Sequence, residues 1–93
     1  MDVAFTTPTD LLVAYVLDFS QCKGFFLLSD VALTIETNSS SAPDQTITLA
    51  ANVPLEWVYG DGTCPITTDI TALYLTSASS GTLKLRSLVD PTV

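Results

Sequence analysis

The sequence contains no histidine and only three basic side chains among its 93 residues. Without histidine, a Ser-His or Cys-His catalytic arrangement is excluded, and so is a histidine-based zinc site. Lys23, Lys84 and Arg86 cannot neutralise the phosphates along a nucleic acid, so the sequence argues against nucleic-acid binding. Ten acidic residues bring the net charge to −7, which also argues against binding to an anionic membrane surface.

Long apolar runs and the motifs of common enzyme sites are missing as well. No stretch approaches the about 20 apolar residues that span a bilayer, and the start of the chain lacks the basic region of a signal peptide. Glu36 and Glu56 could form a two-carboxylate glycosidase pair, but solvated surface carboxylates explain them better. Residues 60–62 lack the lysine of a phosphate-binding loop, and the EF-hand spacing for calcium is absent. We therefore expect a protein that is not an enzyme and has no cofactor, metal or small-molecule substrate.

The chain has two cysteines, Cys22 and Cys64, and neither belongs to a CxxC motif. They could pair with each other. However, without a secretion signal the chain is expected to be made in a reducing cytosol, where two cysteines are more often two buried thiols. The sequence therefore favours free thiols.

What the chain does have is apolar and β-branched. Apolar residues make up 47% of the sequence and charged residues 14%, whereas an average soluble domain carries about 25% charged residues. Threonine suits a solvated strand face and could supply the missing polar surface. Alternatively, another protein chain covers part of the apolar surface, and the two explanations can hold together.

Alternation of apolar and polar residues predicts the fold. Residues 55–59, 72–76 and 82–89 repeat with a period of two, as half-buried antiparallel strands do. Residues 30–37 and 46–50 read as a hairpin with a long tip. The pattern indicates an all-β protein, a small antiparallel β-sandwich or barrel of about six to seven short strands in a single domain over residues 1–93.

The remaining segments are less regular. Residues 11–17 are apolar on both faces, and either a strand or a short helix fits them, with valine content favouring the strand. Residues 77–81 are expected to form a short hairpin connection to the last strand. Residues 1–10 are predicted to be an extended arm or an edge piece, and residues 90–93 an extended tail.

Aromatic and basic residues provide the candidates for function. Trp57 and Tyr59 lie on one face of their predicted strand with Tyr74 on a neighbouring one, which fits a core or subunit contact better than a sugar-stacking platform. Lys84 and Arg86 alternate with leucines on the last strand; they could protect an exposed edge, which we favour, or form a docking stripe for an acidic partner. The candidate interface residues are Phe5, Phe25, Phe26, Leu27, Trp57, Tyr59, Tyr74, Lys84 and Arg86.

Two C-terminal segments, CPITTDITALYLT at 64–76 and GTLKLRSLVDPT at 81–92, resemble the C-terminal part of small virion proteins of tailed bacteriophages. The resemblance implies a protein that is assembled in the host cytoplasm and located in the virion, often as a capsid decoration or cement protein in several copies. Its partners would then be the major capsid protein or other virion subunits, together with further copies of itself. A tail or fibre component, and a carbohydrate-binding β-module built on Trp57, Tyr59 and Tyr74, are the alternatives.

Overall fold

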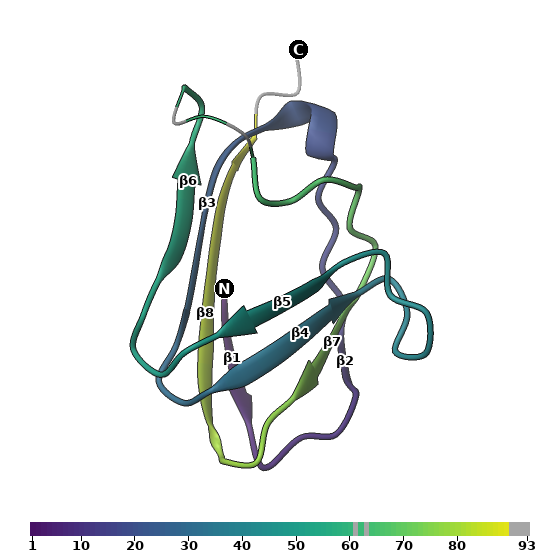
Figure 1. The fold of residues 1–93 in the computed structure, drawn as a ribbon, viewed down its shortest axis with the longest axis vertical. Helices are drawn as coiled ribbons and strands as arrows, with labels where there is room; N and C mark the ends of the chain where they lie inside the picture. The colour runs from purple at the N-terminus through teal and green to yellow at the C-terminus, as the bar shows by residue number, and fades with distance from the viewer. Residues whose placement is uncertain (61, 63, 90–93) are drawn as a thin grey trace.

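The structure, a computed structural model, describes residues 1–60, 62 and 64–89. Within them, eight strands form two four-stranded sheets that pack face to face (Figure 1). Every strand pairing recorded in the two sheets is antiparallel. The predicted all-β sandwich is therefore confirmed, with eight described strands in place of the six to seven expected.

The first sheet, called sheet A, has the strand order β1-β8-β3-β6. Its strands are β1 (Asp2–Phe5), β8 (Gly81–Val89), β3 (Cys22–Ser29) and β6 (Leu55–Val58). The two longest strands, β3 and β8, lie at the centre of this sheet and pair along most of their length. Their register shifts between Cys22 and Gly24, which marks a bulge at the beginning of β3.

The second sheet, called sheet B, has the strand order β2-β7-β4-β5. Its strands are β2 (Leu11–Val13), β7 (Leu73–Thr76), β4 (Leu33–Thr37) and β5 (Thr46–Leu49). β4 and β5 form the predicted hairpin, and in Figure 1 they cross in front of the long strands of sheet A. Residues 11–17 are a strand only as far as Val13; Leu17 then forms an isolated bridge with Ile70, and the 3-10 turn η1 (Phe19–Gln21) leads into β3.

The core lies between the inner faces of the two sheets and follows the predicted alternation. Leu83 and Leu85 of β8 face Leu75 of β7 and Ile35 of β4 in one apolar cluster, and all four side chains are at most 2% exposed. Thr37, a polar side chain in this layer, is satisfied because its hydroxyl donates a hydrogen bond to the Gln45 carbonyl at 3.2 Å.

Two predicted connections differ in the structure. Residues 77–81 do not close a hairpin, because β7 belongs to sheet B and β8 to sheet A, so this segment crosses between the sheets. Of the two alternatives for residues 1–10, the edge piece is the one found: β1 pairs with β8 along its whole length, and Thr7 and Asp10 then take positive φ angles on the way to β2. The predicted tail at 90–93 lies outside the described residues.

Candidate interaction surface

All three basic side chains of the protein lie on or beside the outer face of sheet A. Lys84 and Arg86 point outward from β8 because they alternate with the buried Leu83 and Leu85. Lys23 sits at the bulge of β3, at the end of the same face. Against these cations the strands of this sheet carry only Asp2 and Glu56. Asp30, directly after β3, lines a hollow together with Lys84. The basic side chains of a protein with a net charge of −7 are thus gathered on the side of sheet A.

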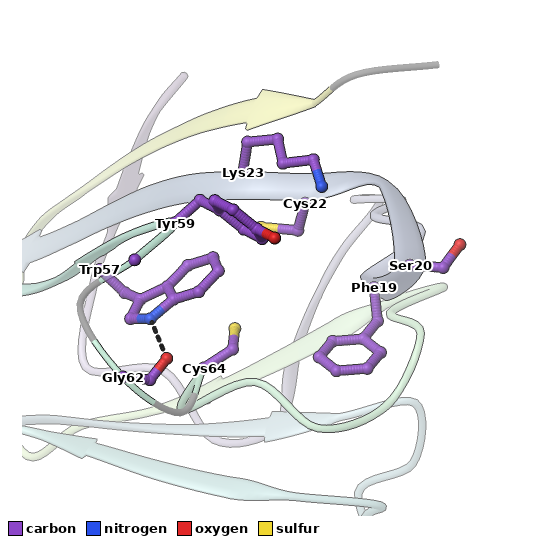
Figure 2. Close-up of a pocket in the computed structure, with 9 residues that line it drawn as sticks. Phe19, Ser20, Cys22, Lys23, Trp57, Tyr59, Gly62 and Cys64 are labelled. Atoms are coloured by element: carbon purple, nitrogen blue, oxygen red, sulfur yellow. Dashed lines mark hydrogen bonds between the residues drawn. The ribbon is translucent and has the colours of Figure 1, made fainter. Parts of the chain in front are cut away.

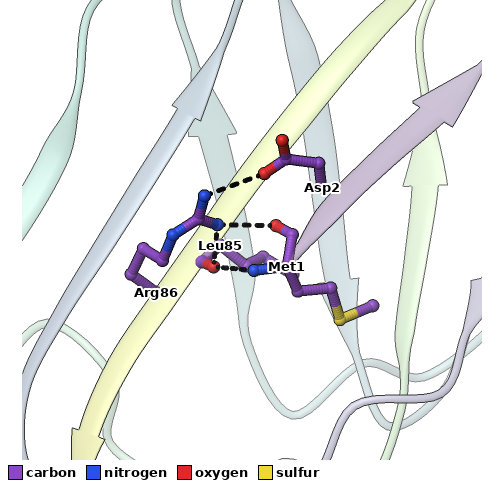
Figure 3. Close-up of polar contacts among 4 residues, drawn as sticks. All are labelled: Met1, Asp2, Leu85 and Arg86. Carbon is purple, nitrogen blue, oxygen red and sulfur yellow. Dashed lines mark hydrogen bonds and ion pairs between the residues drawn. The ribbon is translucent and has the colours of Figure 1, made fainter.

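Arg86 is fixed by the N-terminus of the chain (Figure 3). Its guanidinium pairs with the Asp2 carboxylate at 3.1 Å and donates hydrogen bonds to the carbonyls of Met1 and Leu85 at 3.0 and 2.7 Å. The Met1 amine also donates to the Leu85 carbonyl at 2.8 Å. The Arg86 and Asp2 side chains are 56% and 54% exposed, so the pair adds little stability but holds a solvent-accessible guanidinium in one place.

The position of β8 corrects one interpretation of these cations. β8 lies between β1 and β3, so Lys84 and Arg86 are on a central strand and do not protect a sheet edge. The sequence showed that both side chains point outward, because that direction follows from the alternation of apolar and polar residues along the strand. It did not show the order of the strands in the sheet. Their other interpretation, a docking stripe for an acidic partner, stays a prediction.

An apolar groove of about 290 Å³ opens on this outer face around Gly24. Gly24 pairs with Val58 of β6 on one side and with Leu88 of β8 on the other, and these side chains are 58% and 63% exposed. Because glycine has no side chain, the space between them stays open; an added Cβ would lie 3.2 Å from the Trp57 carbonyl. Phe26 continues the groove along β3. An apolar floor with a charged rim is the composition expected of a protein-binding surface.

The rim of this groove carries both signs of charge. Phe26 pairs with Arg86 on β8 and with Glu56 on β6, so an aromatic ring separates a cation from a carboxylate across the sheet. Lys23 lies at the bulged end of the groove. The three charges surround apolar side chains and can fix the orientation of a partner that places carboxylates near Lys23 and Arg86.

A second hollow, here called the thiol pocket, has a volume of about 560 Å³ and lies beside the first (Figure 2). Trp57 forms one wall: its ring stacks on Phe25 at 6.3 Å between centroids, and its indole N–H donates to the Gly62 carbonyl at 3.2 Å. Tyr59 meets Trp57 edge-on at 6.5 Å, and the Lys23 ammonium lies 4.4 Å from the Tyr59 ring centroid. A cation over an aromatic face is attracted by the ring quadrupole, so Lys23 is held at the mouth of the pocket.

Both cysteines of the chain line the thiol pocket, and both are free thiols. Cys22 is buried, and its Sγ donates to the Gly24 carbonyl at 3.6 Å. Burial raises the pKa of the Cys22 thiol, and the neighbouring Cys64 thiol raises it further. Of the two buried thiols that the sequence favours, Cys22 is buried and Cys64 is half-buried.

The structure separates the predicted interface residues into three groups. Phe26, Tyr59, Lys84 and Arg86 reach the surface on the side of sheet A. Tyr74 is half-buried on the outer face of sheet B. The others belong to the core and are at most 8% exposed: Phe5, Phe25, Leu27 and Trp57. Of these, Phe25 and Trp57 also line the groove, whereas Phe5 and Leu27 do not.

The aromatic platform, the less favoured alternative for these residues, is not assembled. Trp57 and Tyr59 touch each other, but Trp57 is only 8% exposed and Tyr74 belongs to the other sheet. Val58 and Leu88 are the contact residues that sequence reasoning missed. The alternation of side chains along a strand could have identified them. Val58 follows the core residue Trp57 and so points outward, and Leu88 falls on the same side of β8 as Lys84 and Arg86.

Comparison with known proteins found no matching family model, no similar curated protein and no similar solved structure. Among the described residues, no group of three or more His, Cys, Asp or Glu side chains is arranged to hold a metal ion. In that same part of the chain, no helix is long and apolar enough to cross a bilayer. Function therefore has to be inferred from the surfaces of this chain.

Proposed function

We propose that this protein is a non-enzymatic structural protein of a virion, a capsid decoration subunit that binds and stabilises neighbouring coat subunits. The observation that carries the proposal is the outer face of sheet A, where Lys23 and Arg86 line an exposed apolar groove and Lys84 projects from the same strand as Arg86. The resemblance of the C-terminal segments to small virion proteins suggests the kind of partner. A position on the tail instead of the head would use the same surface.

The mechanism is adhesive. A partner's apolar side chain enters the groove beside Val58 and Leu88, and each apolar side chain that becomes fully buried contributes about 1.5–3 kcal/mol. Carboxylates of the partner pair with Lys23 and Arg86 beside the groove, which orients the complex and speeds association. A subunit that binds two coat subunits at once resists their separation, because both contacts must break together.

Copies of the chain are also proposed to bind each other. The strands of sheet B contain no lysine or arginine, and their outer face presents Glu36 among threonines, with Leu12 exposed at one side. This surface complements the apolar outer face of sheet A and its basic side chains. Contact between unlike faces of successive copies closes into a ring when the rotation between copies permits it.

Binding to capsids tests the proposal. Capsids of the phage that carries the gene, stripped of small accessory proteins, are sedimented with the wild-type chain or with Leu88→Asp. Ser40→Asp is the matched control, since it places the same charge at an exposed position on the loop between β4 and β5. We expect wild type and Ser40→Asp to sediment with capsids, and Leu88→Asp to stay in solution while its circular dichroism is unchanged. A wild-type chain that ignores capsids, or a Leu88→Asp chain that binds equally well, would contradict the proposal.

One observation supports the carbohydrate-binding alternative. Tyr59 is 70% exposed beside the thiol pocket, with Lys23 over its ring, so a single aromatic face remains there for a sugar ring. A glycan-array signal that Tyr59→Ala removes, in a chain that does not bind capsids, would favour this function over decoration.

A further inference from the structure

The two thiols of the chain line the same pocket. Cys22 begins β3 and is 5% exposed, whereas Cys64 comes from the segment between β6 and β7 and is half-buried against the core. Both line the thiol pocket, and Figure 2 shows both sulfur atoms directed into it near Trp57. Two residues far apart in sequence thus present sulfur atoms to the same hollow.

We propose that Cys22 and Cys64 form a redox-modification site, in which a small-molecule disulfide such as oxidised glutathione converts the two thiols into one intramolecular disulfide. The sequence has no other cysteine, so a folded monomer allows only this pairing. The proposal does not depend on the proposed function, because it concerns the pocket and not the outer face of sheet A.

The difference in exposure sets the order of the steps. The more accessible Cys64 thiolate attacks one sulfur of oxidised glutathione; a Cys64–glutathione mixed disulfide forms and one glutathione thiolate leaves. The Cys22 thiolate then attacks the Cys64 sulfur, forms the Cys22–Cys64 bond and releases the second glutathione. The two protein thiols lose two protons and two electrons, and both electrons reduce the oxidised glutathione to two thiols.

The surroundings of Cys22 slow the second step. Burial disfavours the Cys22 thiolate, and only the thiolate is the nucleophile. Closure of the disulfide should therefore accelerate as the pH rises toward the range where a buried thiol ionises. The intermediate that accumulates at neutral pH should be the mixed disulfide on Cys64.

The disulfide would join the start of β3 to the segment that follows β6. It would close the side of the thiol pocket that holds the two sulfur atoms, and it would constrain the unfolded chain between positions 22 and 64. Trp57 lines the same pocket, so its fluorescence should report the oxidation. Oxidising surroundings would then stabilise a protein whose reduced form has no covalent cross-link.

The test uses the full chain in mixtures of oxidised and reduced glutathione. We expect a monomer lighter by two hydrogen atoms, a peptide map that links Cys22 to Cys64, and a melting temperature raised on the order of 10 °C. A reductant should reverse all three changes. Cys64→Ser is the control, because it changes the half-buried thiol and should show neither the mass loss nor the rise in melting temperature.

Three results would overturn the proposal. Both thiols could still react with an alkylating agent after oxidation, the final wild-type product could be the mixed disulfide, or the disulfide could link two chains. The mass of wild-type protein decides among these outcomes, so a Cys64→Ser chain that failed to fold would leave the test intact. Capsid binding is measured separately, which keeps a failure here distinct from a failure of the proposed function.

Discussion

The outer faces of the two sheets have the same strand geometry and different chemistry. On sheet B the outward positions of β4 and β5 are Thr34, Glu36, Thr46 and Thr48, an ordinary solvated surface. On sheet A the corresponding positions carry the apolar groove and the basic side chains. Both inner faces are equally apolar and buried, so folding alone does not require the difference. We propose that contact with a partner accounts for the outer face of sheet A.

The largest expected effect tests whether the inner faces of the two sheets contribute equally to the core. Leu83 of sheet A and Leu75 of sheet B are both fully buried at 0% exposure. Leu83→Ala and Leu75→Ala should each lower the free energy of unfolding by about 3 kcal/mol, through lost apolar burial and the cavity left behind. Urea unfolding measures both values. A loss below about 1 kcal/mol for one of them would show that its sheet contributes little to the shared core.

The parts of the fold that could be predicted are those encoded by neighbours in sequence. Alternation along 30–37 and 46–50 identified β4 and β5, and their closeness in the chain identified their pairing. The division of strands between sheets depends on contacts between distant residues, which alternation does not encode. Residues 77–81 look like a hairpin loop for this reason, although β7 and β8 lie in different sheets.

The candidate surface could be predicted only in part, for the same reason. The alternation of residues was enough to place Lys84 and Arg86 on the outward side of their strand. It could not show that Gly24 lies between Val58 and Leu88, since those three residues come from three strands whose order was unknown. The favoured core position holds for Trp57. The alternative of an aromatic platform placed Tyr74 on a strand beside Trp57, and that strand belongs to the opposite sheet.

The second prediction exchanges charge between the two faces. Arg86→Glu and Glu36→Lys should each weaken self-association about tenfold, near 1.4 kcal/mol, because each removes the attraction between unlike faces of successive copies. An equimolar mixture of the two variants should associate better than either alone. Sedimentation equilibrium at low salt measures all three samples. If the mixture associates no better than the single variants, copies do not meet through these two faces.

The third prediction concerns how the stability of the protein depends on pH through Cys22, the thiol at the start of β3 in sheet A. Because the folded pKa of Cys22 is raised, the unfolded chain loses this proton first as the pH rises. Stability is therefore fully present below the ordinary thiol range, about pH 8.5, and falls above it by at most about 1.4 kcal/mol per pH unit. The reduced Cys22→Ala chain should lose this slope, whereas Cys64→Ser should keep most of it. Urea titrations at several pH values, with reductant present, compare the three chains.

The smallest expected effect concerns the Asp2–Arg86 ion pair, and it distinguishes a role in folding stability from a role in binding a partner. Asp2→Asn keeps the shape of the side chain and removes the charge that partners Arg86, so the free energy of unfolding should fall by no more than about 0.5 kcal/mol. The same change makes the outer face of sheet A more positive, and binding to acidic capsid sites should strengthen, most clearly at low salt. Asp44→Asn, on the loop between β4 and β5, is the matched control for net charge. A loss of stability above 1 kcal/mol without a gain in binding would mean that Arg86 serves to anchor the N-terminus. The basic character of the outer face of sheet A would then come from the attachment of the N-terminus and not from partner binding.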